Sequence, residues 1–509
     1  MRTNTAKIVE EQIKKSNKDT STIINETNTE ELIIALCGQL GTNINKINDQ
    51  LSKLLKEDFG YEVQEIKLSK YISKYSSYNL ENTKSKGERI TSGIEGGNEL
   101  RNKHGNSILA QLAIREIALD RSEQTKDQDA EKQTFRSRRK CYIINSLKHP
   151  DELNLLKQIY RNIFYTIGIF SKIKLRETNL KREGLKIPEI YSLIDRDSGE
   201  DKSFGQGVEK TFIKSDYFLR ISSENIKDIK PKIERFLNLI FDNEILTPTI
   251  EETAMYQAAA AATNSACLSR QVGAAITDRD GKILSLGWND VPKFGGDLYN
   301  SSCEIDNRCY NFNNQKCVNE ENKIKISRNI ASNLVENGLI KKEQLDLVKD
   351  SILDNGINRL IEFARSIHAE MHAIIQGSQK TGDKMVGGNL FCTTYPCHNC
   401  ARHILVAGIK KVYYIEPYKK SLGTILHSDA IVEDVEQSDD KLQILMYEGV
   451  APVRFIDFYK MTNDNRKQKL KKEQELISLK PKHTLTLRAI HQLESIVTNE
   501  LKDKELDNL

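Results

Sequence analysis

Two short segments in the last third of this chain constrain its chemistry more than any other feature. The first reads His368-Ala-Glu370, and the second reads Pro396-Cys397-His-Asn-Cys400. Imidazole nitrogen and thiolate sulfur are ligands that zinc prefers, and three protein ligands leave a fourth position on the ion open for water. The two segments therefore predict a zinc site formed by His368, Cys397 and Cys400.

The positions of these residues favour a catalytic ion over a structural one. Cys397 and Cys400 are expected at the start of a helix, which favours thiolate charge, and Pro396 suits the first turn. Zinc would lower the pKa of a bound water towards neutrality. Glu370 lies two residues after His368, so it could take the water's proton without binding the ion and later pass a proton to departing ammonia. A structural zinc ribbon or a redox Cys-x-x-Cys, the two alternatives, has no use for Glu370.

The order H-x-E followed by P-C-x-x-C resembles the signature of zinc nucleobase deaminases. The surrounding stretches resemble deoxycytidylate deaminases. The resemblance is closer still to bacterial anti-phage dCTP deaminases, in which a P-loop kinase-like domain is fused to the deaminase domain. It extends from about residue 31 to about residue 460. The stretches that carry it are Leu147–Asp151, Ser269–Ala274, Gly287–Asn289, Val291–Gly296, His368–Ala373, Thr393–His403 and Ile415–Ser421.

This resemblance implies a zinc-dependent hydrolase of nucleotide metabolism. Its substrates would be free deoxycytidine nucleotides, with dCTP converted to dUTP and dCMP to dUMP, and ammonia released. Depletion of dCTP would limit phage DNA synthesis and would therefore act as an antiviral defence. We also expect a homo-oligomer, with its trigger left open between a protein or RNA inhibitor and a phage-dependent activator.

Three alternatives to this function stay open. A housekeeping dCMP deaminase would supply dUMP, although such supply needs only the compact catalytic domain. A polynucleotide-editing deaminase would flip a cytidine of DNA or RNA into the same pocket. A protein without enzymatic activity would hold a structural zinc ion and sense nucleotides.

Several residues near the motif are candidate substrate contacts. Asn289 is expected to end a strand and could bind the sugar hydroxyl or the base edge. Trp288 and Tyr395 could form a wall against the base. Four cations could contact phosphate; they are Arg270, Lys293, Lys419 and Lys420.

Cys303, Cys309 and Cys317 cluster ahead of the motif. With a His or Asp as fourth ligand they could hold a second zinc ion, as some related deoxycytidylate deaminases do. Their C-x5-C-x7-C spacing is looser than that of a zinc ribbon. Free buried thiols are therefore the favoured interpretation.

The N-terminal half has the pattern of an α/β domain. The run Leu32–Cys37 predicts a buried strand, and Gly38, Gly41 and Thr42 follow it at the place of a phosphate-binding loop. A working loop reads G-x-x-x-x-G-K-[ST]. Here the second glycine, the lysine and the hydroxyl are replaced; the residues in their places are Asn43, Ile44 and Asn45. We therefore expect a P-loop-like fold with a regulatory or sensing role in place of kinase activity, or a scaffold for oligomerisation.

These patterns predict a two-domain α/β protein. The boundary at Thr247-Pro248 follows from the resistance of proline to helix continuation. The deaminase domain is expected to have three layers, α/β/α, around a mixed sheet of about five strands. The expected segments are a flexible lead-in (1–30), a degenerate P-loop kinase-like domain (31–247), the deaminase domain (248–462) and a charged helical tail (463–509). Within them we expect a basic loop at 67–97, an irregular insertion at 297–327 and a last strand at 453–458.

Composition limits the partners. The chain has 76 Lys and Arg against 72 Asp and Glu, for a formal charge of +4. This near balance argues against a stable nucleic-acid substrate. No apolar run approaches the roughly 18–20 residues of a membrane span, and no secretory leader is visible at the N-terminus. We therefore expect a cytoplasmic protein without a membrane partner.

Overall fold

The computed structural model describes residues 27–123, 137–199, 203–221, 226–417, 421–433, 440–461 and 476–506, together with Asp19, Thr22, Asn25 and Ser438. The chain divides into two compact units. Unit 1 comprises Met1–Thr247 and Glu448–Leu509, and unit 2 comprises Pro248–Tyr447. The division at Thr247 lies where proline predicts it. Unit 2 ends at Tyr447 instead of the expected 462, and the following residues return to unit 1.

Unit 1 is built on a six-stranded sheet with the order β13-β6-β5-β2-β4-β3. The five long strands are parallel, and only β13 runs antiparallel, beside β6. The strands are β2 (Leu32–Gly38), β3 (Glu62–Lys67), β4 (Lys140–Asn145), β5 (Phe164–Ser171), β6 (Tyr217–Ile221) and β13 (Gly449–Val450). A separate pair joins β1 (Asn28–Thr29) to β14 (Leu485–Thr486).

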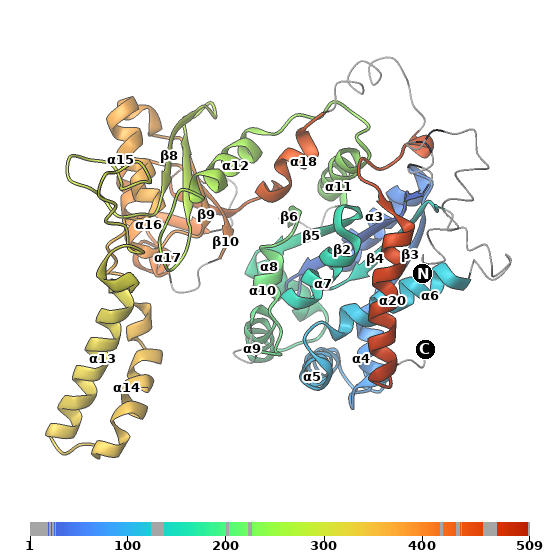
Figure 1. Ribbon diagram of the computed structural model, residues 1–509, viewed down its shortest axis with the longest axis horizontal. Coiled ribbons are helices and arrows are strands. Elements are labelled where there is room, and N and C mark those ends of the chain that lie inside the picture. Colours follow the sequence, from blue (N-terminus) through green and yellow to red (C-terminus); the bar gives the residue numbers. More distant parts are fainter. Residues whose placement is uncertain are drawn as a thin grey trace, which may run out of the picture. The chain divides into compact units, whose positions relative to one another are not determined.

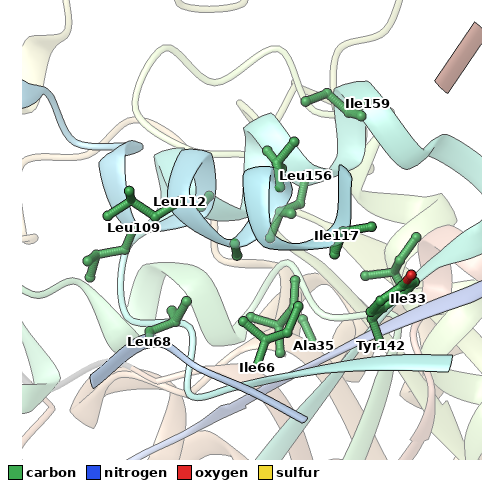
Figure 2. Packing of buried hydrophobic residues seen from close by; sticks show 14 of the residues in the cluster. Ile33, Ala35, Ile66, Leu68, Leu109, Leu112, Ile117, Tyr142, Leu156 and Ile159 are labelled. Carbon is green, nitrogen blue, oxygen red and sulfur yellow. The ribbon is translucent and has the colours of Figure 1, made fainter. Parts of the chain in front are cut away.

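Helices cover both faces of this sheet. Strand β2 is therefore buried along its whole length, and its successive side chains point to opposite faces. Ile33 and Ala35 enter one core cluster, and Leu32, Ile34 and Leu36 enter another. Figure 2 shows the first cluster, where helices α6 and α7 lie above Ile33, Ala35 and the neighbouring strands. The helices are α3 (Ile44–Glu57), α4 (Leu68–Tyr75), α5 (Lys86–His104), α6 (Ile108–Glu123), α7 (Pro150–Tyr160), α8 (Ile173–Arg182), α9 (Ile187–Ser198), α10 (Val208–Phe212), α11 (Ile226–Phe241), α18 (Phe455–Tyr459) and α20 (Leu487–Asp503).

The segment expected as a basic loop at 67–97 contains helices α4 and α5 instead. Ser85 caps α5 by accepting a hydrogen bond from the backbone N–H of Glu88. The glycines that weaken the helical pattern allow close packing, since a Cβ on Gly96 would lie 2.5 Å from the Ile72 side chain of α4. The prediction of a loop is therefore wrong. The glycines lower the intrinsic helix propensity of this segment, but close packing against α4 stabilises the helix.

The expected strand at 453–458 is also wrong. Pro452 begins a short 3-10 turn, and Phe455–Tyr459 form helix α18 of unit 1. A short apolar run cannot be assigned to helix or strand by periodicity alone. Proline, which has its torsion fixed near the helical value, favours the helical start here.

Unit 2 contains a mixed sheet of six strands, one more than expected, in the order β11-β12-β10-β9-β7-β8. Strands β7 and β8 form an antiparallel hairpin, β9 pairs antiparallel with β7, and the remaining pairs are parallel. The strands are β7 (Gly273–Thr277), β8 (Ile283–Trp288), β9 (Asn389–Thr394), β10 (Lys411–Glu416), β11 (Ile431–Glu433) and β12 (Leu442–Met446).

Two glycines bring a helix close to each face of the hairpin. A Cβ on Gly273 would overlap the backbone of α12 at Ala258, and one on Gly287 would overlap the backbone of α15 at Ala369. Gly287 pairs with Ala274, which neighbours Gly273, so the two glycines face opposite sides of the sheet. Unit 2 is therefore a three-layer α/β/α structure, as predicted. Its helices are α12 (Ile250–Ala262), α13 (Val318–Glu336), α14 (Leu345–Asp354), α15 (Ala369–Thr381), α16 (His398–Val406) and α17 (Gly423–Leu426).

The insertion between the hairpin and the first zinc segment is partly helical. Helix α13 begins at Val318, within the stretch expected to be irregular, and packs beside α14 (Figure 1). Glu320 and Glu321 lie in its first turn, where acidic residues favour a helix N-terminus. In the described part of the chain, no helix is long and apolar enough to cross a membrane.

Candidate metal centre and catalytic pocket

The three predicted zinc ligands come together at the ends of two helices. His368 is the N-cap residue of α15, and Cys397 is the N-cap residue of α16, after strand β9. His368 Nδ1 lies 3.4 Å from Cys397 Sγ and 3.3 Å from Cys400 Sγ. One ligand atom from each residue lies within 4.8 Å of the other two. This imidazole and two thiols fit a zinc ion with one open position.

The electrostatics of the three side chains suit metal binding. Hydrogen bonds from Cys400 and His368 lower the pKa of the Cys397 thiol to about 4. The hydrogen bond to Cys397 raises the pKa of His368 to about 9. The shared hydrogen bond with Cys397 and burial raise the pKa of Cys400. Cys397 is thus a thiolate beside an imidazolium, and zinc would replace the protons held by His368 and Cys400.

Glu370 lies in the first turn of α15, two residues after His368, and is only 3% exposed. Burial raises the pKa of its carboxyl group above the usual range. A raised pKa suits a group that must both accept and return protons. Zinc, when bound, supplies Lewis-acid activation of water near neutral pH. The Glu370 carboxyl group lines the same cavity wall as His368 and Cys397.

A cavity of about 360 Å³ joins this centre to the rest of unit 2. Its wall includes His368, Glu370 and Cys397 at one end. Of the predicted substrate contacts, Asn289, Arg270 and Tyr395 also line it. A cavity of this size matches a small-molecule site.

These three side chains already have partners. Asn289 accepts a hydrogen bond from the backbone N–H of Val272 (2.7 Å) and donates one to the carbonyl of Arg270 (2.8 Å). The Arg270 guanidinium lies 3.4 Å from Glu416 and is 43% exposed. The Tyr395 hydroxyl donates to Glu433, which fixes the ring edge-on to Tyr414.

Other predicted contacts lie elsewhere. Trp288 does not line the cavity; its ring meets the His372 ring edge-to-face, and its backbone N–H donates to His372 Nδ1. Lys293 lies in a turn closed by its N–H and the carbonyl of Asp297, also away from the cavity wall. Lys419 and Lys420 lie outside the described residues.

The second zinc site is not assembled. Among the described residues, the only group of His, Cys, Asp or Glu that could hold a metal ion is His368, Cys397 and Cys400. The Cys303 thiol interacts with Asn300, while Cys309 and Cys317 line the catalytic cavity as free thiols. The looser spacing of these cysteines is consistent with this outcome.

Two cations of the cavity wall were not predicted. Lys323 on α13 is 5% exposed, and its ammonium donates to the carbonyl of Asn358. Arg365 lies over the Phe312 ring at 3.7 Å and donates to the carbonyl of Asn307. Arg365 stands three residues before His368, so its proximity to the motif was a usable signal. The sequence offered no such signal for Lys323, because helix α13, on which it lies, was not expected.

Comparisons with known proteins support this assignment for part of the chain. Residues 248–416 match the sequence model of the family described as "Cytidine and deoxycytidylate deaminase zinc-binding region". ComE operon protein 2 of Bacillus subtilis is 54% identical over 56 residues, which cover 11% of this chain and 29% of that protein.

Two deoxycytidylate deaminases match over longer stretches. The Saccharomyces cerevisiae protein is 22% identical over 296 residues, covering 55% of this chain and 77% of the relative. The protein of Enterobacteria phage T2 is 28% identical over 157 residues, covering 31% of this chain and 74% of the relative. Together with the grouping of His368, Cys397 and Cys400, these matches show that the chain carries a zinc-binding cytidine deaminase domain.

Proposed function

We propose that unit 2 deaminates free deoxycytidine nucleotides, converting dCMP to dUMP and dCTP to dUTP with release of ammonia. The observation that carries this proposal is the position of Glu370, which is buried in the same cavity as His368 and Cys397. A structural zinc site needs no buried carboxylate beside it. The deoxycytidylate deaminases of yeast and phage T2 support the substrate class.

In the proposed mechanism, Glu370 accepts a proton from the attacking water and transfers it to the ring nitrogen next to the amino-bearing carbon. The resulting hydroxide adds to that carbon. Glu370 then takes the proton of the hydroxyl group so formed and delivers it to the amino group, so that the carbonyl forms as the C–N bond breaks and ammonia leaves. Burial raises the pKa of Glu370, which makes the protonated form accessible for the second transfer. His368, Cys397 and Cys400 hold the zinc ion.

We propose that Arg270, Lys323 and Arg365 contact the phosphate chain. Their cationic groups line the cavity with the zinc ligands, and Arg270 and Arg365 can bind phosphate through two N–H groups at once. Glu320, in the first turn of α13, lines the same wall and lies 3.6 Å from Lys323 Nζ, so Lys323 is already partly compensated. The guanidinium groups of Arg270 and Arg365 favour a nucleotide over a nucleoside.

We also propose that this activity depletes dCTP and so limits phage DNA synthesis. The support is the resemblance of the stretches around both zinc segments to anti-phage dCTP deaminases. We further propose that unit 1 has a P-loop-like fold. The residues of its loop, which follows β2, are Gly38, Gly41 and Thr42.

Ammonia release from dCMP, dCTP, CTP, deoxycytidine and cytosine-containing single-stranded DNA tests the function. We expect turnover of dCMP or dCTP and its loss in Glu370→Ala with zinc still bound. Turnover of single-stranded DNA alone would make the protein an editing enzyme. Turnover of dCMP but not of dCTP would favour the alternative function, a housekeeping dCMP deaminase.

The phosphate contacts have their own test. Lys323→Met and Arg365→Met should raise KM for dCMP about tenfold or more, while turnover of deoxycytidine stays unchanged. Lys325→Met is the matched control, because Lys325 is exposed on the same helix and does not line the cavity. Equal losses on dCMP and deoxycytidine would show that the two cations support the fold of the cavity instead.

A further inference from the structure

Unit 1 contains a second cavity, of about 440 Å³, which the deaminase chemistry does not use. It lies at the carboxyl ends of three adjacent parallel strands. Its wall contains Gly41–Asn45 after β2, Lys67–Ser69 after β3, and Asn145, Ser146 and Lys148 at the end of β4. In open parallel sheets, ligands bind outside the carboxyl ends of the strands.

The charge of this wall is positive. Five cations line the cavity, against two carboxylates, Glu183 and Asp197. The cations are Lys67, Lys86, Arg89, Arg101 and Lys148. Arg101 is neutralised by Glu152 behind the wall (2.8 Å), and Lys67 by Glu65 (3.1 Å). Arg89 is exposed and has no ion pair in the part of the chain that the structure describes.

Two cations, Lys148 and Arg176, donate hydrogen bonds to carbonyl groups at the end of β2 and in the loop after it. Lys148 Nζ lies 2.7 Å from Asp197, whose other oxygen accepts a hydrogen bond from the N–H of Leu40 (2.6 Å). Arg176 is 4% exposed and donates to the Leu40 carbonyl and to Gln39, while its Nη2 has no partner. Among the described residues Arg176 has no ion pair; it lies behind the cavity wall and not in it. Burial of an unpaired charge is costly, and an anionic ligand would reduce that cost.

The cavity wall also includes a helix N-terminus and two polar side chains that lack hydrogen-bond partners. Helix α3 has no side-chain cap and no acidic residue in its first turn, and a helix N-terminus favours negative charge. The N–H of its first residue, Ile44, donates to the carbonyl of Thr42 (2.8 Å). Thr42 Oγ1 and Gln206 Oε1 are buried without a hydrogen-bond partner, and both residues line the cavity. Gln206 is only 7% exposed. Buried polar atoms without partners are rare, so these two point to a ligand.

Apolar side chains on α4 and α5, among them Ile72, Ile90 and Ile94, complete the wall. A cavity that is cationic at a helix N-terminus and apolar elsewhere fits a phosphate group attached to a ring. We propose that this cavity binds a nucleotide, with its phosphates at Thr42, Arg89 and Lys148 and its nucleoside against α4 and α5. The site is one of binding alone, since Ile44 and Asn45 stand where phosphoryl transfer needs a lysine and a hydroxyl.

Direct binding to the full zinc-loaded chain tests this proposal, with ATP and dTTP as the nucleotide probes. Pyrophosphate, inorganic phosphate and adenosine are the comparison ligands. We expect one nucleotide per chain, weaker binding of pyrophosphate and phosphate, and affinity that falls with salt. Arg89→Met should weaken nucleotide binding about tenfold or more. Arg89 is exposed and unpaired, so its replacement should leave the melting temperature unchanged.

Lys53→Met is the matched control, because Lys53 is exposed on α3 and does not line the cavity. Nucleotide binding that Arg89→Met and Lys148→Met leave unchanged, or no binding of ATP or dTTP at millimolar concentration, would overturn the proposal. Equal affinity for pyrophosphate and ATP would overturn its nucleoside part. Glu370→Gln should bind ATP as the native chain does, so failure of the deaminase proposal is separable from failure of this one.

Discussion

Gly287 illustrates how the absence of one side-chain carbon can control the position of the Glu370 carboxylate. A Cβ at this position of β8 would overlap the carbonyl oxygen of Ala369 and the N–H of Ala373, both in the backbone of α15. The helix would have to move, and Glu370 is in its first turn. We expect Gly287→Ala to lower kcat about a hundredfold and to destabilise unit 2 by about 1–3 kcal/mol.

Steady-state kinetics and thermal melting of Gly287→Ala check this prediction. Gly93→Ala is the control, because no atom lies within 4 Å of the added Cβ and the residue is inside helix α5. That control should be as stable as the native chain or more so. Native kcat in Gly287→Ala would show that α15 tolerates the displacement.

Asp306 gives a prediction about pH. Arg308 donates to both of its carboxylate oxygens, and the Tyr310 hydroxyl donates to one of them. These hydrogen bonds, with that of Arg308 first, hold the pKa of Asp306 well below its usual range. A carboxylate with a lowered folded-state pKa contributes stability above its unfolded pKa of about 4 and loses it as pH falls towards the folded value.

Asp306→Asn should therefore destabilise unit 2 by about 1–3 kcal/mol at pH 7. The difference from the native chain should stay constant above about pH 5 and shrink as pH falls from about 5 to about 2. Melting temperatures of the two chains across this range measure the effect. A difference that is constant with pH would mean that the carboxylate charge does not contribute.

At this scale the sequence predicted the grouping of His368, Cys397 and Cys400 but not the whole cavity. His368, Cys397 and Cys400 are recognisable because metal binding restricts residue type and local spacing. Lys323 is brought to the wall by tertiary packing of α13, for which no local spacing exists. Trp288 was predicted to form a wall against the base, but its ring packs on His372 away from the cavity, because successive strand residues face opposite sides of a sheet.

Helix α20 packs in the core of unit 1, although the whole of unit 2 separates it in the sequence from most of that unit. It was expected to lie in a charged tail, but Leu487, Ile490, Val497 and Leu501 are buried in a core cluster of unit 1. Its Glu494 is buried and pairs with Arg121, which also binds Glu31. A helix was expected here, but its many charged residues hid the packing of this helix in the core, because its apolar positions occupy only one face.

Ile490→Ala should destabilise unit 1 by about 2–5 kcal/mol, because it removes buried methyl groups and leaves a cavity. Ile496→Ala on the same helix is the matched control: Ile496 is 64% exposed, and its replacement should change stability by less than about 0.5 kcal/mol. Urea unfolding of both variants gives the comparison. Equal midpoints would contradict the docking of α20 in the core.

The whole molecule is discontinuous in sequence, because unit 1 is formed by residues on both sides of unit 2. The sequence predicted the first boundary, which has a proline, but not the return at Glu448, which has no such mark. Strand β13, with only two residues, and α20 complete unit 1 after that point. Short strands and helices that depend on distant partners leave little local signal.

This division predicts two thermal transitions, because each unit buries its own apolar side chains and only unit 2 contains the zinc ligands. Zinc that binds the folded state stabilises it by linkage. A chelator should therefore lower the midpoint of one transition, and Cys397→Ser should lower the same one without a chelator. Ile490→Ala should lower the other midpoint and leave the zinc content unchanged. Calorimetry of the native chain and both variants, with and without chelator, checks each assignment. A chelator that shifted both midpoints equally would show that the two units unfold as one cooperative body.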